Sequence, residues 1–572
     1  MTLSDFQEVW CADFEYSAQA GEHPSPACLV AREYHTGRLL RIWQDELLQL
    51  DHPPFPIGRD SLFVGYFASA EMSCFRSLGW SPPDNILDLY VEFRAVTSGL
   101  PTPHGRGLLG ALLHHGLPAI STNSKLTMRQ LAMRGGPYTP QEQQALMDYC
   151  QSDVDALVML LTAMLPRIDL TRAVYRGWYM VAVAGMETTG VPIDTERLAL
   201  FRQRWEGIKL ELVARTNNRW FGVYDGLTFK ADRWQEWLKL NDLAWPSLPS
   251  GRLALDRDTF RDMARINPVF APIYELRAAL AQVKLHALPV GGDGRNRCML
   301  SPYSSKTGRN QPSTTKFVFG LPSWLRSLIR PTPGMALGYI DWSQQELGIA
   351  AALSGDKPMQ DAYRSGDFYL RFGQMAGVIP AGATKESHEE LREQFKTASL
   401  GVLYGLSEWG LGNRLGNPAL SQNLMMLHRQ TFKRYWDWSQ LVRDTAMLTG
   451  RLETVFGWPV HAGKKANPRS LMNFPMQGNG AEMLRLACSR AVEQGIAVCV
   501  PVHDAVLVQA PMGEIETAVA RMQGIMVWAS TTVLNGFELR SDAKIIRYPD
   551  RYRDKRGSRM WGLVCELCGV PS

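Results

Sequence analysis

The sequence predicts a multidomain α/β protein. Its 572 residues exceed what one hydrophobic core usually organises, so three or four domains are expected. Strand-like apolar runs alternate with helical patterns over residues 1–166 and again from Gly291 onward, and a mainly helical stretch lies between them at Leu170–Leu288. Hydrophobic residues make up 45% and charged residues 20% of the chain, a composition that excludes a disordered or fibrous protein.

Charge and cysteine content indicate which partners and which cellular environment the protein is suited to. The net charge of +5 is compatible with a polyanionic partner but does not demand one. No uncharged apolar run reaches about 18 residues, so neither export nor a membrane partner is expected. The nine cysteines are scattered and odd in number, as expected of reduced thiols in a cytoplasm. Cys565 and Cys568 form a CxxC without the second pair that a zinc ribbon needs.

Two apolar runs in the C-terminal half end on aspartate. Ala336–Ile340 is followed by Asp341, and the run from Val498 reaches His503 and Asp504, where a hairpin turn is expected. Two carboxylates held at strand ends can bind a pair of magnesium ions, one activating an attacking hydroxyl and the other the leaving phosphate. Each aspartate alone has a simpler explanation, which is a polar residue in a turn.

A helix is expected between the two aspartates. Ser387-His388-Glu389-Glu390 has the pattern of a capping box at its start, and Gly405 can end it. Four residues on this helix recur at four-residue spacing and therefore share one face: Arg392, Lys396, Leu400 and Tyr404. Two cations followed by an apolar residue and an aromatic can bind a triphosphate and pack on its base, although cations on a helix are usually just solvated.

Together these segments resemble family A DNA polymerases. The three catalytic motifs of that family correspond to DWSQQELGIAAALSGD (Asp341–Asp356), REQFKTASLGVLYG (Arg392–Gly405) and VHDAV (Val502–Val506). Further matches lie at TGR (Thr307–Arg309), RSLMNFPMQGNGAEML (Arg469–Leu484) and METTGVPID (Met186–Asp194). Ordered matches over about 320 residues make chance similarity very improbable.

The resemblance implies a role for each matching residue. Asp341 and Asp504 would bind the catalytic Mg²⁺ ions, for which Mn²⁺ can substitute, and Glu346 would lie under the sugar and exclude a 2′-hydroxyl. Lys396 would also neutralise the leaving pyrophosphate. The nucleotide-binding residues would be Arg392, Lys396, Leu400 and Tyr404, with His503 at the primer terminus. The residues that contact primer–template DNA would be Arg309, Arg469, Asn473 and Gln477.

Two positions depart from the family pattern. The third motif usually reads His-Asp-Glu, and here Ala505 replaces the glutamate, which predicts altered metal affinity with activity retained. In the second motif an aromatic usually precedes the glycine, and here Leu400 does, which changes the packing on the incoming sugar and base.

The N-terminal region carries a second set of acids. Asp13-Phe14-Glu15 lies at the end of an expected strand, Val9–Phe14, and Tyr149 and Asp153 lie about 135 residues later on an expected helix, Gln141–Leu165. In this order, ahead of a family A polymerase, they resemble the first and third motifs of DnaQ-like 3′–5′ exonucleases.

In that family two metals would be held by Asp13, Glu15 and Asp153, and Tyr149 would orient the attacking water. The middle carboxylate is expected to be Glu71, with Asp88 as its competitor. The alternative is a decayed exonuclease kept as a scaffold.

The resemblance also implies the domain order. An RNase H-like exonuclease domain (1–166) would precede a linker, palm start and thumb (167–290). Palm (291–345), fingers (346–468), a second palm segment (469–546) and a tail (547–572) would complete a right-hand polymerase.

The implied activity is template-directed addition of deoxynucleotides to a primer, with proofreading. The absence of room for a 5′-nuclease before Asp13 favours a phage or plasmid replicase in a bacterial cytoplasm, with unknown replisome or processivity partners. A single-subunit RNA polymerase shares the aspartates and the Arg/Lys helix, but Glu346 and the exonuclease motifs argue against it. A catalytically silent nucleic-acid-binding protein would explain Ala505 and Leu400 as decay.

Overall fold

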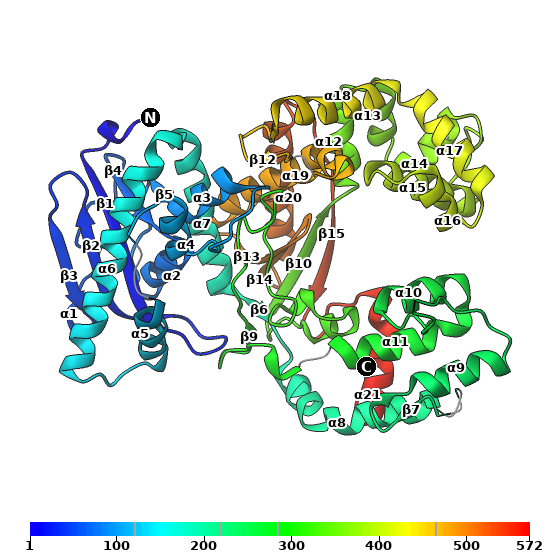
Figure 1. The fold of residues 1–572 in the computed structure, drawn as a ribbon, viewed down its shortest axis with the longest axis horizontal. Helices are drawn as coiled ribbons and strands as arrows, with labels where there is room; N and C mark the ends of the chain where they lie inside the picture. Colours follow the sequence, from blue (N-terminus) through cyan, green and yellow to red (C-terminus); the bar gives the residue numbers. More distant parts are fainter. Residues whose placement is uncertain (119–121, 218–219, 221, 249, 283–284, 464–465) are drawn as a thin grey trace.

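The computed structural model describes residues 1–118, 122–217, 220, 222–248, 250–282, 285–463 and 466–572. It is a mixed α/β protein of several bodies, as the sequence predicts. Figure 1 shows an N-terminal body on the left, a second sheet at the centre and two helical lobes on the right. No helix in the described ranges is long and apolar enough to cross a bilayer.

The N-terminal body is built on a five-stranded sheet in the order β3-β2-β1-β4-β5. β1 runs antiparallel to β2 and parallel to β4, which is in turn parallel to β5. The strands are β1 (Glu8–Ser17), β2 (Ser25–Glu33), β3 (Leu39–Trp43), β4 (Ser61–Gly65) and β5 (Ile86–Asp88). The helices are α1 (Gln44–Leu47), α2 (Ser69–Ser77), α3 (Leu89–Thr97), α4 (Leu108–His114), α5 (Thr122–Arg134) and α6 (Pro140–Met164).

Alternation along β1 divides its side chains between two cores. Val9 and Cys11 pack in the core that includes α6, whereas Trp10 and Ala12 pack in the core that includes α2 and α7 (Leu170–Thr189). Successive side chains of a strand point to opposite faces, so Asp13 and Glu15 continue the set that faces α6. The periodicity of β1 therefore directs the Asp-x-Glu pair toward the helix that carries Asp153.

Helix α7 joins the N-terminal body to the rest of the chain, since it packs against α2 and β5 on one side and α19 and β13 on the other. A mainly helical lobe follows, at the lower right of Figure 1. Its elements are β6 (Val191–Pro192), α8 (Thr195–Asn217), β7 (Tyr224–Asp225), β8 (Thr228–Phe229), α9 (Ala231–Leu240), α10 (Arg257–Ile266) and α11 (Ala271–Gln282). The predicted helical character of this stretch is confirmed. It is interrupted by β6, which pairs with β9, and by an isolated bridge between Ser247 and Leu253.

The second sheet is antiparallel, in the order β13-β14-β10-β15. Its strands are β10 (Met335–Trp342), β13 (Ala497–Val502), β14 (Ala505–Pro511) and β15 (Ser541–Arg547), and β9 (Arg295–Asn296) pairs with β6 outside it. Helix α20 (Ile515–Val533) covers one face and packs on the long helix α19 (Pro468–Glu493). The hairpin turn between β13 and β14 lies at His503–Asp504, as predicted.

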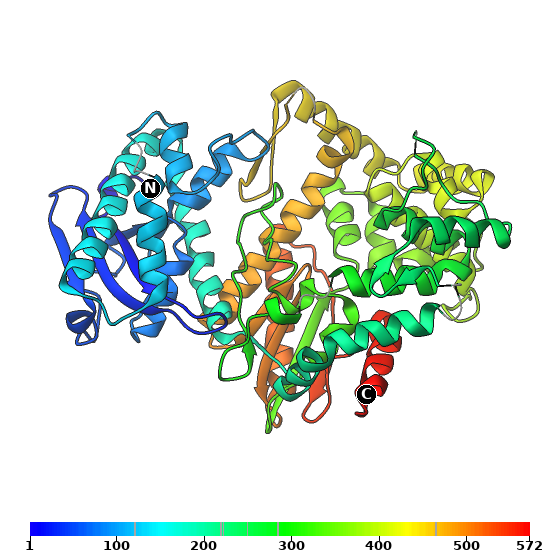
Figure 2. The same cartoon turned by 60° about the horizontal axis from the view of Figure 1, so that its bottom comes forward.

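A second helical lobe connects β10 to α19, at the upper right of Figure 1. Its elements are α12 (Gln345–Ser354), α13 (Lys357–Arg364), α14 (Phe368–Met375), α15 (Glu389–Leu403), α16 (Glu408–Leu415), α17 (Pro418–Thr431), α18 (Lys433–Thr449), β11 (Arg451–Glu453) and β12 (Pro459–His461). After β15 the chain ends in α21 (Ser558–Leu567), which packs against α8 (Figure 2).

Candidate active sites

Two aspartates lie side by side on the second sheet. Asp341 is near the end of β10, and its register partner on β14 is Ala505, so Asp504 in the preceding turn is directly next to it. Burial, repulsion from Asp504 and repulsion from Asp542 raise the pKa of Asp341 to about 7, and burial also raises the pKa of Asp504. Asp341 Oδ1 is buried and has no hydrogen-bond partner among the described residues. Two acids that resist joint ionisation, one with a buried unbonded oxygen, fit a divalent cation.

A third acid, Asp542, lies on the other side of Asp341. It is the register partner of Asp341 on β15, and Ser343 Oγ donates a hydrogen bond of 2.5 Å to its Oδ2. Asp341 therefore has a carboxylate as its register partner on β15, in Asp542, whereas its register partner on β14, Ala505, carries none. Sequence reasoning missed Asp542 because strand register, which is a tertiary property, brings it to the site.

A small polar cluster lies beside the aspartates. Arg309 Nη2 donates to Glu346 Oε1 at 3.3 Å. Burial, followed by the neighbouring carboxylate of Glu346, raises the pKa of Tyr404 to about 12. The charge of Asp504 contributes to the raised pKa of Tyr404. Burial raises the pKa of Asp504, and the nearby charge of Arg309 offsets part of that rise. Residues from a loop, α12 and the end of α15 thus converge on the turn that carries Asp504.

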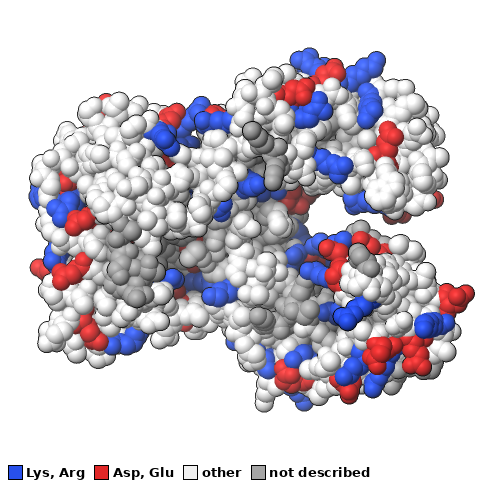
Figure 3. Space-filling view, in the orientation of Figure 1, with Lys and Arg blue, Asp and Glu red and all other residues white. Residues whose placement is uncertain are grey.

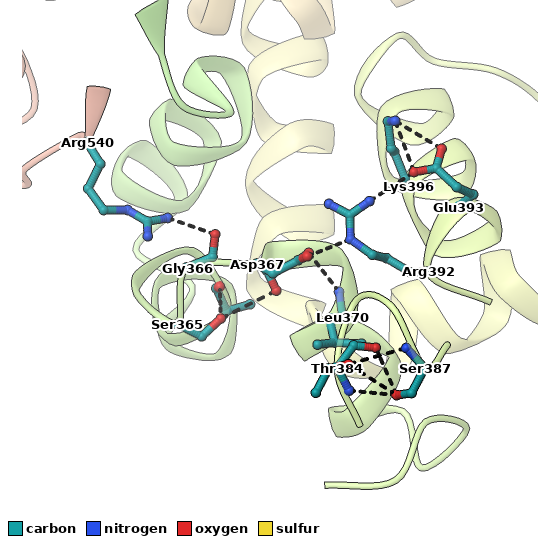
Figure 4. A network of polar contacts seen from close by, with 11 residues as sticks. Ser365, Gly366, Asp367, Leu370, Thr384, Ser387, Arg392, Glu393, Lys396 and Arg540 are labelled. Carbon is teal, nitrogen blue, oxygen red and sulfur yellow. Dashed lines mark hydrogen bonds and ion pairs between the residues drawn. The ribbon is translucent and has the colours of Figure 1, made fainter. Parts of the chain in front are cut away.

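The predicted cationic face of α15 is present, and Figure 4 shows its partners. Arg392 Nε donates to Asp367 Oδ2 at 2.5 Å and Arg392 Nη1 to Glu393 Oε1 at 2.9 Å. Lys396 Nζ donates to Glu393 Oε2 at 2.9 Å. Both cations are therefore bound by acids of the helical lobe rather than by the two aspartates. Leu400 follows on the same helix and is half-buried.

The expected capping box at the start of this helix is wrong. α15 begins at Glu389 with His388 as its N-cap, which makes no side-chain capping bond. The hydroxyl of Ser387 instead accepts a hydrogen bond of 2.9 Å from the backbone N–H of Thr384. Because this turn already engages the hydroxyl, it does not cap the helix. Gly405, with φ of +67°, follows the helix end as predicted.

The other predicted DNA contacts lie on α19 and in the hairpin turn. Arg469 is exposed in the first turn of α19, and Asn473 and Gln477 follow at four-residue spacing on the same face. Asn473 is buried, and its Oδ1 has no hydrogen-bond partner among the described residues. His503 is exposed in the turn with a left-handed φ of +59°.

The second site lies in the N-terminal body. Asp13 and Glu15 on β1 and Asp153 on α6 each offer a carboxylate oxygen, and these oxygens lie within 4.8 Å of one another. That spacing and an all-oxygen donor set fit a divalent metal ion. Tyr149, one turn before Asp153 on α6, hydrogen-bonds with Asp153; burial and this partner raise the pKa of Tyr149.

Glu71 and Asp88 have different surroundings. Glu71 is 4% exposed, its Oε2 has no hydrogen-bond partner among the described residues, and burial followed by repulsion from Asp13 raises its pKa well above the usual range. Asp88 accepts hydrogen bonds from four backbone N–H groups, those of Phe67, Ala68, Tyr90 and Val91. Glu71 therefore faces the acidic cluster, whereas Asp88 caps α3 and fixes the start of α2.

The two sites lie on different bodies of the molecule, one on the second sheet and the other in the N-terminal body. Figure 3 shows an open cleft between the two helical lobes, with Lys and Arg side chains along part of its rim. The second sheet forms the back of this cleft in the ribbon view, and the N-terminal body lies on the opposite side of that sheet (Figure 1).

Comparisons with known proteins agree with this architecture. Residues 320–545 match the family model of DNA polymerase family A. DNA polymerase I of Chloroflexus aurantiacus is 26% identical over 424 residues, which cover 65% of this chain and 43% of that protein. The thermostable DNA polymerase I of Thermus thermophilus is 29% identical over 203 residues, 33% of this chain and 24% of that protein. The chain thus spans less than half the length of these two relatives.

A solved structure shares the fold of nearly the whole chain. The POL domain of Pol1 from M. smegmatis, in complex with DNA primer-template and dNTP, superposes with a TM-score of 0.71 and 18% identity, covering 96% of each chain. The chain therefore shares the fold of a solved polymerase domain. Its segment 320–545 matches DNA polymerase family A, and the two relatives compared above are both DNA polymerases I.

Proposed function

We propose that this protein is a DNA-directed DNA polymerase that adds deoxynucleotides to the 3′ end of a primer. The observation that carries the proposal is the pair Asp341 and Asp504, neighbours on one sheet, next to the cluster of Arg309, Glu346 and Tyr404. A fold shared with a polymerase domain bound to DNA primer-template and dNTP supports the same reaction and partners here.

The chain supplies metal ligands and a triphosphate site. Asp341 and Asp504 would hold two Mg²⁺ or Mn²⁺ ions, which when bound activate the primer 3′-hydroxyl and stabilise charge on the leaving phosphate. Arg392 and Lys396 bind the triphosphate, for which they exchange the acidic partners seen in Figure 4. Lys396 also neutralises the departing pyrophosphate.

The remaining residues orient the substrates. Glu346 lies under the incoming sugar and excludes a 2′-hydroxyl, and Leu400 packs against that nucleotide. Tyr404 borders the templating base and His503 the primer terminus. Primer–template contacts come from Arg309, Arg469, Asn473 and Gln477, of which Arg469 is exposed and Asn473 has a buried oxygen with no partner in the part of the chain that the structure describes.

The domain roles follow from this assignment. Residues 1–166 form an RNase H-like domain, supported by the mixed sheet β3-β2-β1-β4-β5 with an acidic pair on its central strand. Residues 167–290 link to the palm and form the thumb, 291–345 and 469–546 form the palm, 346–468 form the fingers, and 547–572 form the tail.

We further propose that the N-terminal domain is a 3′–5′ exonuclease. Asp13, Glu15 and Asp153 bind the metals, and Tyr149 orients the attacking water. Glu71 completes the site as the middle carboxylate, because it faces the acids with an unbonded oxygen while four backbone amides already occupy Asp88.

Separation of the two activities tests both proposals. With Mg²⁺, wild-type protein should extend a primer with deoxynucleotides in preference to ribonucleotides and should degrade single-stranded DNA from its 3′ end. Asp504→Ala should abolish extension only, and Asp13→Ala with Glu15→Ala should abolish degradation only. If folded wild-type protein does not extend a primer, the result favours a catalytically silent nucleic-acid-binding protein. A preference for ribonucleotides would indicate an RNA polymerase. Equal loss of both activities in Asp504→Ala would refute two separate sites.

A further inference from the structure

The loop that carries Arg309 is held on both sides. It spans residues 301–309, and its last residue but one, Gly308, has a φ of +73°, which glycine adopts freely but which strains other residues. A Cβ on Gly308 would lie 3.2 Å from both Arg485 and Trp458. The backbone at Gly308 therefore leaves little room for a side chain. The path of the loop places the Arg309 guanidinium 3.3 Å from Glu346.

On one side, the loop is held by Trp458, which precedes β12, and by Arg485 on α19. Trp458 Nε1 donates to the carbonyl of Lys306 at 3.0 Å, and Arg485 Nη1 donates to the carbonyl of Gly308 at 2.6 Å. Arg485 is itself held by Glu482 at 2.8 Å, and both side chains are 3% exposed. Both side chains that hold this side of the loop are therefore buried.

The loop is also held by the N-terminal domain. Arg94 on α3 is 2% exposed; its Nε donates to the carbonyl of Tyr303 at 3.1 Å, and its Nη2 donates to the carbonyl of Ser304. Tyr90 lies one turn before Arg94 on the same face of α3, and Ser98 is the C-cap residue of this helix, four residues after Arg94. The Tyr90 hydroxyl bonds with Ser304 Oγ at 3.2 Å, and Ser98 Oγ donates to the carbonyl of Lys306 at 3.2 Å.

Arg94 is not explained by an ion pair within its own domain. In the described part of the chain it has no carboxylate partner, whereas Arg176 nearby forms a two-bond pair with Glu92 at 2.6 and 2.7 Å. Burying a guanidinium is costly unless its N–H groups are bonded, and those of Arg94 find carbonyls of a loop more than 200 residues away. Close approach of the two bodies is also built in beside it, since a Cβ on Gly99 would lie 2.4 Å from the carbonyl of His461.

We infer that Arg94, with Tyr90 and Ser98, is a positioning residue for the polymerase site: the N-terminal domain holds the 301–309 loop so that Arg309 reaches Glu346 and the primer–template DNA. This inference rests on the proposed polymerase function. It makes the N-terminal domain a structural part of the polymerase site, independent of its own metal centre.

The test combines single variants with a double-mutant cycle. Arg94→Met is expected to lower kcat/KM for primer extension by about tenfold to a hundredfold, the size of lost bonds to a charged donor. Tyr90→Phe and Ser98→Ala, which keep the packing, should each cost about twofold to fivefold. Degradation of single-stranded DNA should stay within about twofold of wild type. Arg32→Met is the matched control, an arginine of the same domain that pairs with Asp155 far from the loop.

Two readouts separate positioning from general destabilisation. If Arg94 acts through Arg309, the double variant Arg94→Met with Arg309→Met should extend no worse than Arg309→Met alone. Hydrogen exchange of the 301–309 peptide should accelerate in Arg94→Met but not in Arg32→Met. Additive losses, unchanged exchange in the loop, or equal effects of the control would overturn the inference. A wild type without extension would refute the proposed function, while loop exchange would still decide whether Arg94 holds the loop.

Discussion

Asp504→Asn is expected to stabilise the metal-free protein while it abolishes primer extension. The pKa of Asp341 is raised from an ordinary 3.8 to about 7. For a fully buried group, a rise of that size would lower the free energy of unfolding at high pH by about 4 kcal/mol. Asp341 is partly exposed, and burial is a larger cause than repulsion from Asp504. Removing the charge of Asp504 should therefore raise the free energy of unfolding by only on the order of 1 kcal/mol.

The pH dependence gives this prediction its sign. A carboxyl whose pKa is raised on folding contributes stability that is present below 3.8 and lost as pH rises through about 7. In EDTA, Asp504→Asn should thus exceed wild type in thermal stability at pH 8, and the difference should shrink at pH 5, where folded wild type already has a protonated Asp341.

The assay is thermal unfolding at both pH values, with EDTA and with Mg²⁺. Mg²⁺ should raise the Tm of wild type at pH 8 and raise that of Asp504→Asn much less, because ligand binding stabilises only the state that binds. Asp444→Asn, at an exposed ion pair on α18, is the control and should respond to Mg²⁺ like wild type. A variant less stable than wild type at pH 8 in EDTA, or a gain of equal size at pH 5, would refute the reasoning.

Three further predictions concern single residues. Glu71→Gln should reduce single-strand degradation by several orders of magnitude without lowering Tm, whereas Asp88→Asn should mainly lower Tm because four backbone amides lose a charged acceptor; nuclease rates and melting curves that show the reverse would make Asp88 the middle carboxylate. Leu400→Tyr should lower KM for deoxynucleotides about fivefold or more and raise dideoxynucleotide use, with discrimination against ribonucleotides unchanged; single-nucleotide incorporation in an exonuclease-deficient background measures this, and collapse of ribonucleotide discrimination alone would contradict the assigned position. Burial raises the pKa of Glu187 to about 7, so stability present below pH 4.5 is lost as pH rises through 7, and Glu187→Gln should be more stable than wild type at pH 8 by up to about 3 kcal/mol; an equal difference at pH 4 in denaturation curves would contradict it.

Local patterns in the sequence predicted most elements and the family. The strand at Val9–Phe14, the hairpin turn at His503–Asp504 and the helix from Glu389 to Leu403 are each encoded within about 20 residues, where apolar patterns and turn chemistry act directly. The start of that helix was predicted wrongly because Ser387 has two possible local partners, and a turn with Thr384 competes with the cap.

The sequence by itself determined the multidomain α/β class, the similarity of residues 320–545 to DNA polymerase family A and which residues bear charge at the candidate sites. Only the tertiary structure decided which of them meet. Register between β10 and β15 brings Asp542 beside Asp341, and packing between the domains places Arg94 on the loop that ends at Arg309. It also gave Glu71 and Asp88 different surroundings. These contacts join segments up to more than 200 residues apart, and no local periodicity reports them, because strand register and domain packing are set by how whole faces fit together.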